Sequence, residues 1–142
     1  MTERAVLSAS SSASAFELEV AVLERDIDDL EHVNNAVYLR WVQEVATAHW
    51  ESLASASEQE TVAWVVVRHE IDYKAPALAG DEVLLRTWVG KATRATFERF
   101  TEIARKRDRL ILAQARTLWC PISSVTGKPT RVSAELRAQF SR

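Results

Sequence analysis

The stretch Arg25–Trp41, RDIDDLEHVNNAVYLRW, decides the fold of this chain. A loop rich in Asp, His and Asn runs directly into an amphipathic helix, which we predict from about Asn35 to Ala54 because apolar residues recur there at spacings of three and four. Asn34 or Asn35 suits the N-cap position. The first N–H groups of a helix have no intrahelical partner, so this helix start is a ready site for a negatively charged oxygen. A carboxylate beside such a site is the arrangement that acyl transfer requires.

Strand patterns flank this helix on both sides. Alternating apolar and polar residues predict a strand at Phe16–Val22, and most of Thr61–Pro121 is rich in β-branched and aromatic residues. The predicted later strands are Val62–Tyr73, Glu82–Val89, Ala95–Arg105 and Leu110–Cys120, with turns at Lys74–Asp81 and Lys106–Asp108 and a short helix at Val132–Phe140. The order predicts an α+β domain in which a curved antiparallel sheet of about five strands wraps around one long helix. Residues 1–15 include the low-complexity run SASSSASA and are expected to form a disordered tail before a single domain at 16–142.

The composition excludes several classes of function. The chain has 142 residues, 47% of them apolar and 27% charged, with a net charge of -2, so no global charge favours nucleic acid or a membrane surface. No apolar run approaches the roughly 20 residues that cross a bilayer. The single cysteine, Cys120, excludes an internal disulfide and fits a reducing compartment. We therefore expect a cytoplasmic protein without a metal site, since its three histidines lack clustered Cys or carboxylate partners.

Two motifs carry a resemblance to a known family. The first comprises Asp28, His32, Val33, Asn34, Asn35, Tyr38 and Trp41, and the second is HEIDYKAPALAGDEV at His69–Val83. In the same order of elements from Phe16 to Cys120, the chain resembles the hotdog-fold acyl-CoA thioesterases of the 4-hydroxybenzoyl-CoA thioesterase superfamily. It is most similar to the acyl-CoA and plant acyl-carrier-protein thioesterase branches. The resemblance implies a hotdog fold and hydrolysis of an acyl thioester to a free acid and a thiol.

The resemblance also implies roles for individual residues. Asp28 matches the catalytic carboxylate, acting as a general base on water or as a nucleophile through an anhydride. The backbone N–H of Asn35 matches the donor that polarises the thioester carbonyl. His32 and Asn34 match catalytic or positioning residues, and Tyr38 is expected to bind substrate. The only cofactor involved would be coenzyme A as part of the substrate.

Two positions depart from the family pattern. Many members have glycine just before the histidine, where this chain has Glu31, and glycine adopts left-handed backbone more easily. The loop is therefore expected to differ in shape. The plant branch has asparagine two residues before its histidine, where this chain has Leu30, so one polar partner of that catalytic set is missing.

Each candidate also has a purely structural interpretation. Asp26, Asp28 and Asp29 together suit a solvated turn, and paired asparagines suit a cap and a turn. Among the remaining polar residues, we expect His49 to pack in the core and His69 to be structural. Glu44 is a reserve carboxylate that is expected to face solvent or to pair with Arg40, which lies four residues before it on the helix. The tryptophans at positions 64, 88 and 119 are expected in the core or an interface.

Basic residues near two predicted turns suggest a site for the phosphates of coenzyme A. One predicted turn is surrounded by Arg105, Lys106, Arg107 and Arg109. The turn before it in the sequence contains Lys91 and Arg94. Arginine binds phosphate well, so Arg94 and Arg105 are candidate substrate ligands, although such charge runs also occur as solvated faces.

The resemblance further implies a homodimer or homotetramer, with the thioester site at a subunit interface and an acyl-CoA or acyl-carrier-protein thioester as partner. Two alternatives are considered. The chain could be a non-catalytic acyl-CoA-binding hotdog module, an alternative that the departures at Leu30 and Glu31 leave open. A hotdog enoyl-CoA hydratase is disfavoured because the His-Phe-Pro signature of the dehydratases is absent.

Overall fold

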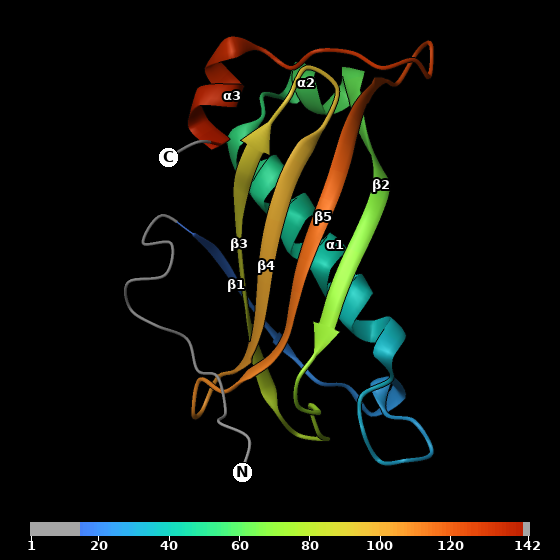
Figure 1. Ribbon diagram of the computed structural model, residues 1–142, viewed down its shortest axis with the longest axis vertical. Helices are drawn as coiled ribbons and strands as arrows, with labels where there is room; N and C mark the ends of the chain where they lie inside the picture. Colours follow the sequence, from blue (N-terminus) through green and yellow to red (C-terminus); the bar gives the residue numbers. More distant parts are fainter. Residues whose placement is uncertain (1–14, 141–142) are drawn as a thin grey trace.

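An antiparallel sheet of five strands forms the body of the molecule, in the order β1-β3-β4-β5-β2. The computed structural model describes residues 15–140, so the tail expected at residues 1–15 lies almost entirely outside the described residues. The strands are β1 Phe16–Ala21, β2 Val62–Tyr73, β3 Glu82–Ala92, β4 Phe97–Arg105 and β5 Ile111–Ser123. Strands β3, β4 and β5 form a meander, and β1 and β2 are added at its two edges (Figure 1).

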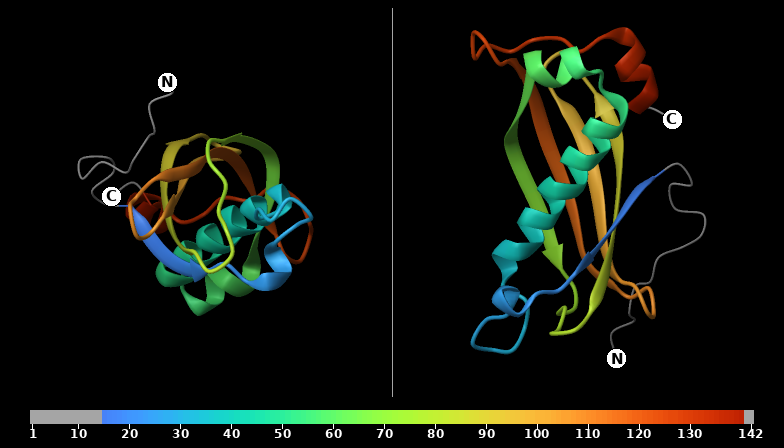
Figure 2. Two further views of the ribbon diagram at one scale, coloured as in Figure 1. Left: turned by 90° about the horizontal axis from the view of Figure 1, so that it is seen from below. Right: turned by 180° about the vertical axis from the view of Figure 1, so that it is seen from behind.

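One long helix, α1 (Asn35–Leu53), lies across the concave face of this sheet. Seen from the end of the molecule, the sheet curls around the helix (Figure 2). The helix buries an apolar stripe along its length, which includes Trp41, Val42 and Val45. A curved antiparallel sheet wrapped around one helix is the predicted hotdog fold, which is therefore confirmed.

The chain after α1 departs from the expected course at one point. Ser55 and Glu58 are polar residues that suit the exit from the long helix, but they form a capping box that starts a second helix, α2 (Ala56–Thr61). The Ser55 hydroxyl accepts the N–H of Glu58, and the Glu58 carboxylate accepts the N–H of Ser55. A short helix α3 (Ala134–Phe140) follows the sheet, as predicted.

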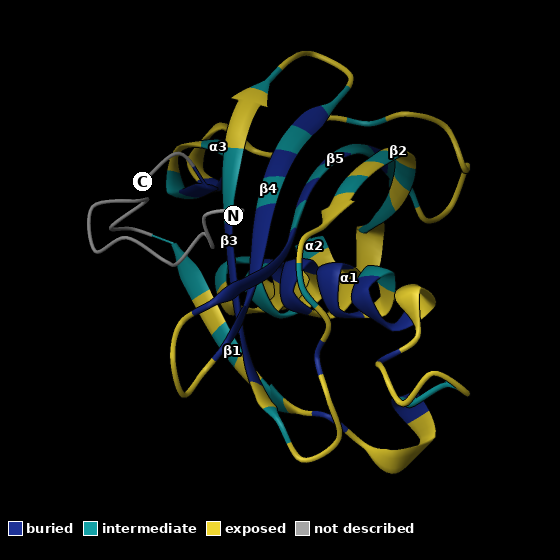
Figure 3. Ribbon diagram, turned by 60° about the horizontal axis from the view of Figure 1, so that its bottom comes forward, coloured by how far each residue is buried: buried dark blue, intermediate teal, exposed yellow. Residues whose placement is uncertain are grey.

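The interior contains two apolar clusters, one toward each end of α1. The larger cluster surrounds the first half of the helix and includes Tyr38 and Trp41. The smaller cluster lies around Trp50 and includes Phe97 and Phe140, so α3 closes this end of the sheet. Burial is lower along the edge strand β2 than in the middle of the sheet (Figure 3).

Candidate active site

A buried carboxylate anchors the loop that precedes α1. Asp26 is only 1% exposed and ends a short 3-10 helix at Glu24–Asp26. Its carboxylate accepts the N–H of Leu23 at 2.9 Å and a guanidinium N–H of Arg40 at 3.0 Å, while its carbonyl accepts the N–H of Asn34. Arg40 also pairs with Glu44, as expected from their spacing. Asp26 therefore fixes the loop to the first turns of the helix.

Asp28 and Glu31 shape the tip of the same loop. The N–H of Asp28 donates to the carbonyl of His32, and the N–H of Glu31 donates to the carbonyl of Asp28. One carboxylate oxygen of Asp28 accepts the N–H of Leu30 at 2.9 Å. Glu31 has a φ of 62°, so it adopts the left-handed backbone that glycine adopts without strain. Glu31 thus holds the backbone conformation that glycine would adopt here, and a difference in loop shape from the family stays a prediction.

The start of α1 presents one open backbone donor. Asn34 is the N-cap, because its side-chain oxygen accepts the N–H of Ala36 and its carbonyl accepts the N–H of Val37. Within residues 15–140, the N–H of Asn35 has no hydrogen-bond acceptor. This N–H therefore remains available to a ligand at the helix start, where the helix dipole favours negative charge.

A groove of about 240 Å³ lies directly at this helix start. Three predicted site residues line it, namely His32, Asn35 and Tyr38, together with Tyr73 and Lys74 from the end of β2. The Tyr73 hydroxyl donates to the carbonyl of Asn35 at 3.1 Å, which ties β2 to the helix start. The groove thus combines a histidine, a helix N-terminus and a lysine on one surface.

Tyr38 contributes to the floor of the groove. It is 2% exposed, and its hydroxyl accepts the N–H of Ala77 at 2.8 Å. Burial raises the pKa of the Tyr38 phenol, so the residue stays neutral. Its hydrogen bond holds the Lys74–Asp81 turn against α1.

Tyr73 and Lys74 did not appear among the predicted site residues. A signal for them was present, since a Tyr-Lys pair at the end of a strand and directly before a proline turn lies where a strand leaves the sheet. Asp28 and Asn34 do not line the groove, although they belong to the loop that forms its border.

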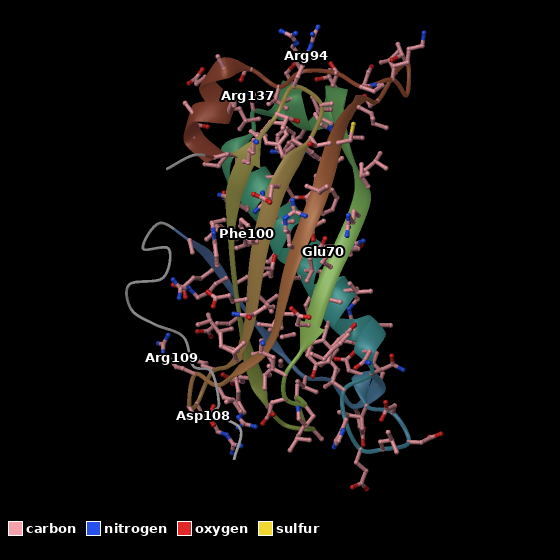
Figure 4. The ribbon with its side chains drawn as sticks, in the orientation of Figure 1. Glu70, Arg94, Phe100, Asp108, Arg109 and Arg137 are labelled. Atoms are coloured by element: carbon pink, nitrogen blue, oxygen red, sulfur yellow. The ribbon has the colours of Figure 1, made fainter. Side chains whose placement is uncertain are left out.

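The two candidate phosphate ligands lie at opposite ends of the sheet. Figure 4 labels Arg94 at one end of the molecule and Asp108, the partner of Arg105, at the other. Arg94 lies in the β3–β4 turn, beside a hollow of about 410 Å³ that Arg131 and Arg137 also line. Arg105 lies at the far end of β4, is 8% exposed, and donates two hydrogen bonds to the carboxylate of Asp108. The structure therefore groups Arg94 with Arg131 and Arg137, and it occupies the guanidinium of Arg105 within its own turn.

Between residues 15 and 140, no cluster of three or more His, Cys, Asp or Glu side chains could hold a metal ion. In the same region, no helix has the length and apolar character that spanning a membrane demands.

Comparison with known proteins connects this geometry to a family. A family model described as the thioesterase-like superfamily matches residues 22–140, which includes the loop, α1 and the whole meander. A comparison with curated protein sequences finds no match.

Solved structures with the same fold include several thioesterases. A 1,4-dihydroxy-2-naphthoyl-CoA thioesterase from Synechocystis is 23% identical, with a TM-score of 0.76 over 89% of this chain and 96% of its own. A thioesterase from Thermus thermophilus, solved with coenzyme A and zinc, is 24% identical, with a TM-score of 0.77 over 91% and 98%. A probable thioesterase from Escherichia coli is 25% identical, with a TM-score of 0.73 over 89% and 98%.

Proposed function

The chain belongs to the thioesterase-like superfamily and is a thioesterase, and from this premise we propose that it hydrolyses acyl thioesters of coenzyme A in the groove beside Asn35. The observation that carries the proposal is the open N–H of Asn35 at the start of α1. The next two N–H groups of the helix are already bonded to Asn34. A thioester carbonyl that accepts the Asn35 N–H would develop its negative charge there, and one such donor is worth about 3 kcal/mol in a transition state.

Asp28 is the proposed base or nucleophile. One of its carboxylate oxygens is held by the Leu30 N–H, which fixes the side chain and leaves the other oxygen without a partner among residues 15–140. As a base, Asp28 takes a proton from water while the water oxygen attacks the carbonyl carbon. The C–S bond then breaks, and the thiolate leaves with the proton. As a nucleophile, Asp28 would form an anhydride that water hydrolyses.

His32 is proposed to orient the attacking water, and Asn34 to hold the helix start. His32 lines the groove, and its backbone pairs with Leu78 across a short antiparallel bridge. Asn34 acts through its capping bonds and not through contact with substrate.

The proposed assembly is a homo-oligomer in which two copies pair along β2. This edge strand is 12 residues long and exposes Val65 and Val67, which are 44% and 60% accessible. A long edge strand with exposed apolar side chains tends to pair with a strand of another chain unless it is already covered. A two-fold related copy would pair with it antiparallel.

Such pairing gives Arg94 a role. In one chain, the groove lies at the end of β2 and the basic hollow lies at the opposite end of the sheet, so β2 separates them by roughly 40 Å at the usual strand rise. Antiparallel pairing would place the hollow of one copy near the groove of the other. Arg94 and Arg131 are therefore the proposed ligands of the coenzyme A phosphates across the interface. A cytoplasmic location remains a prediction.

Thiol release from a panel of acyl-CoA thioesters tests the proposal. We expect Asp28→Asn to lower kcat by a factor of about 100 or more with an unchanged melting temperature, because a positioned acid-base group contributes 10²–10⁴-fold. Asp29→Asn is the matched control, since Asp29 is the exposed neighbour in the same turn. Full activity in Asp28→Asn would refute the assignment. Tight retention of acyl-CoA without thiol release by the wild type would indicate a binding module instead.

A further inference from the structure

A layer of polar side chains crosses the interior between α1 and the sheet. The buried members are Thr87, Arg99, Thr101 and Thr117, and the half-buried His49 and His69 complete the layer. The layer is internally bonded, because Arg99 donates to Thr87 at 3.0 Å and the rings of His49 and His69 bond to Arg99 and Thr117. A polar layer in an otherwise apolar interior costs stability unless its groups are satisfied.

Arg99 is the member of this layer whose positive charge has no carboxylate partner among residues 15–140. It is 6% exposed, and its partners are the neutral groups Thr87 and His49 and the ring of Phe140, whose centroid lies 5.7 Å away. Among residues 15–140, no carboxylate lies within 4 Å of its guanidinium. Burial lowers the pKa of Arg99 to about 10, which still leaves it charged at neutral pH. A buried cation without an anion is expensive, and such charges normally pair.

Arg99 borders a small aromatic cavity of about 50 Å³. The walls include Trp50, Trp64, Phe97, Trp119 and Phe140. The indole N–H groups of Trp64 and Trp119 are buried and have no hydrogen-bond partner in the described part of the chain, and the same holds for Nε2 of His69 in the adjoining layer. One wall of the cavity thus carries a positive charge, and two others carry unused donors.

We propose that this cavity binds a carboxylate at the far end of the acyl group, so that the preferred substrates are ω-carboxyacyl thioesters. A carboxylate supplies the missing charge for Arg99 and accepts from the indole donors, whereas water would satisfy the donors and leave the charge uncompensated. The aromatic walls suit the methylene chain that precedes the carboxylate. This inference rests on the proposed function, since it names the substrate class of that site.

The cavity lies where an acyl chain from a second copy can reach it. Ala46, the first cavity residue on α1, is about 17 Å along the helix from Asn35, and the packed cluster around Trp41 fills the space between. Trp64, however, belongs to β2, the edge strand by which two copies are proposed to pair. The groove of one copy would therefore deliver the acyl end to the cavity of the other.

Matched pairs of thioesters test the inference through thiol release. Succinyl-, glutaryl-, adipyl- and suberyl-CoA are compared with the unsubstituted acyl-CoA of the same carbon number. We expect a higher kcat/KM for at least one carboxylated member. Arg99→Met should reduce that preference by about tenfold or more, as expected when a charged hydrogen bond is lost. Trp119→Phe and Trp64→Phe, which keep an aromatic ring of smaller size and remove one indole donor, should each reduce the preference less.

Arg116→Met is the matched control, because Arg116 precedes Thr117 on β5 and so lies on the opposite face of the sheet, where it pairs with Glu98. The Arg116→Met variant should keep the preference for carboxylated thioesters. The inference is overturned if carboxylated thioesters show no advantage, or if the advantage survives in Arg99→Met. If Arg99→Met does not fold, an advantage that survives in both tryptophan variants overturns it instead.

A separate measurement keeps the cavity testable if no thioester is hydrolysed, which would be a failure of the proposed function. Hexanoate should change the tryptophan fluorescence of the wild type in a saturable way, because three tryptophans line the cavity. Hexanol, the neutral analogue, should not. Equal responses to the two compounds, or an unchanged hexanoate response in Arg99→Met, would count against the carboxylate site.

Discussion

At the scale of single residues, the loop before α1 divides its three aspartates among different tasks. Asp26 is buried and bonded to Arg40, Asp28 is half-buried in a turn, and Asp29 is exposed. The sequence predicts an acidic turn but cannot show which carboxylate points inward, because the three residues are all aspartates and lie within four positions of one another. The division depends on Arg40, which reaches the loop from the second turn of the helix.

Glu31 holds a left-handed backbone conformation, which is strained for a residue other than glycine. Its φ of 62° costs a non-glycine residue about 1–2 kcal/mol, while glycine gains flexibility in the unfolded chain worth about 0.5–1 kcal/mol. We therefore expect Glu31→Gly to raise the free energy of unfolding by roughly 0.5–1 kcal/mol, as measured by chemical denaturation. Glu51→Gly, on an exposed position of α1, is the control and should lower it by about 1 kcal/mol. A loss of stability in Glu31→Gly would show that no strain is relieved.

At the scale of elements, helices and strands were predictable wherever side-chain periodicity set them. The long helix, the strands and the terminal helix were predicted to within a few residues at their ends, because each buries one face against the same core. The short helix α2 was missed since its six residues contain no apolar stripe, although its capping box was visible in Ser55 and Glu58.

Successive hairpin turns of a meander alternate between its ends, and this rule by itself separates Arg94 from Arg105, because the two residues belong to successive turns.

The N-cap of α1 links helix stability to the proposed chemistry. Asn34→Ala should lower the free energy of unfolding by about 1 kcal/mol, as is typical for the loss of a capping side chain. It should also lower kcat, because the Asn35 N–H would no longer be held in place. Ser55→Ala removes the equivalent cap from α2 and should cost similar stability without changing kcat. Equal kinetic effects in the two variants would mean that the cap has no link to the site.

The polar layer between α1 and the sheet predicts a pH dependence of stability. Burial, and secondarily the charge of Arg99, lowers the pKa of His49 from 6.5 to about 4. Between these values the unfolded chain binds more protons than the folded chain, so stability is fully present above pH 6.5 and is lost as the pH falls toward 4. Allowing for partial solvent screening, we expect a loss of about 1–2 kcal/mol. Urea titrations at several pH values in this window measure the free energy of unfolding. His49→Gln should lose less of this free energy than the wild type as the pH falls, and an equal pH dependence in the two proteins would exclude His49 as the cause.

At the scale of the whole molecule, the site was only partly predictable. His32, Asn35 and Tyr38 meet in one groove because they lie within two turns of the same loop and helix start. The aromatic cavity was not predictable, since Arg99, Trp64 and Trp119 come from three strands whose register no local pattern specifies. The groove and the cavity lie toward opposite ends of the chain's long helix, and only a second copy would bring such ends together.

That arrangement makes activity depend on assembly. Val67 is 60% exposed on the β2 edge, at a break in the strand register, so Val67→Lys places a charge where the second copy would pair. We expect this variant to sediment as a monomer and to lose thioesterase activity, even though its melting curve stays cooperative. Val125→Lys is the control, because Val125 is equally apolar and 86% exposed but lies in the turn after β5. A monomeric Val67→Lys with full activity would show that each chain contains a complete site, and it would refute the roles proposed for the basic hollow and the aromatic cavity across the interface.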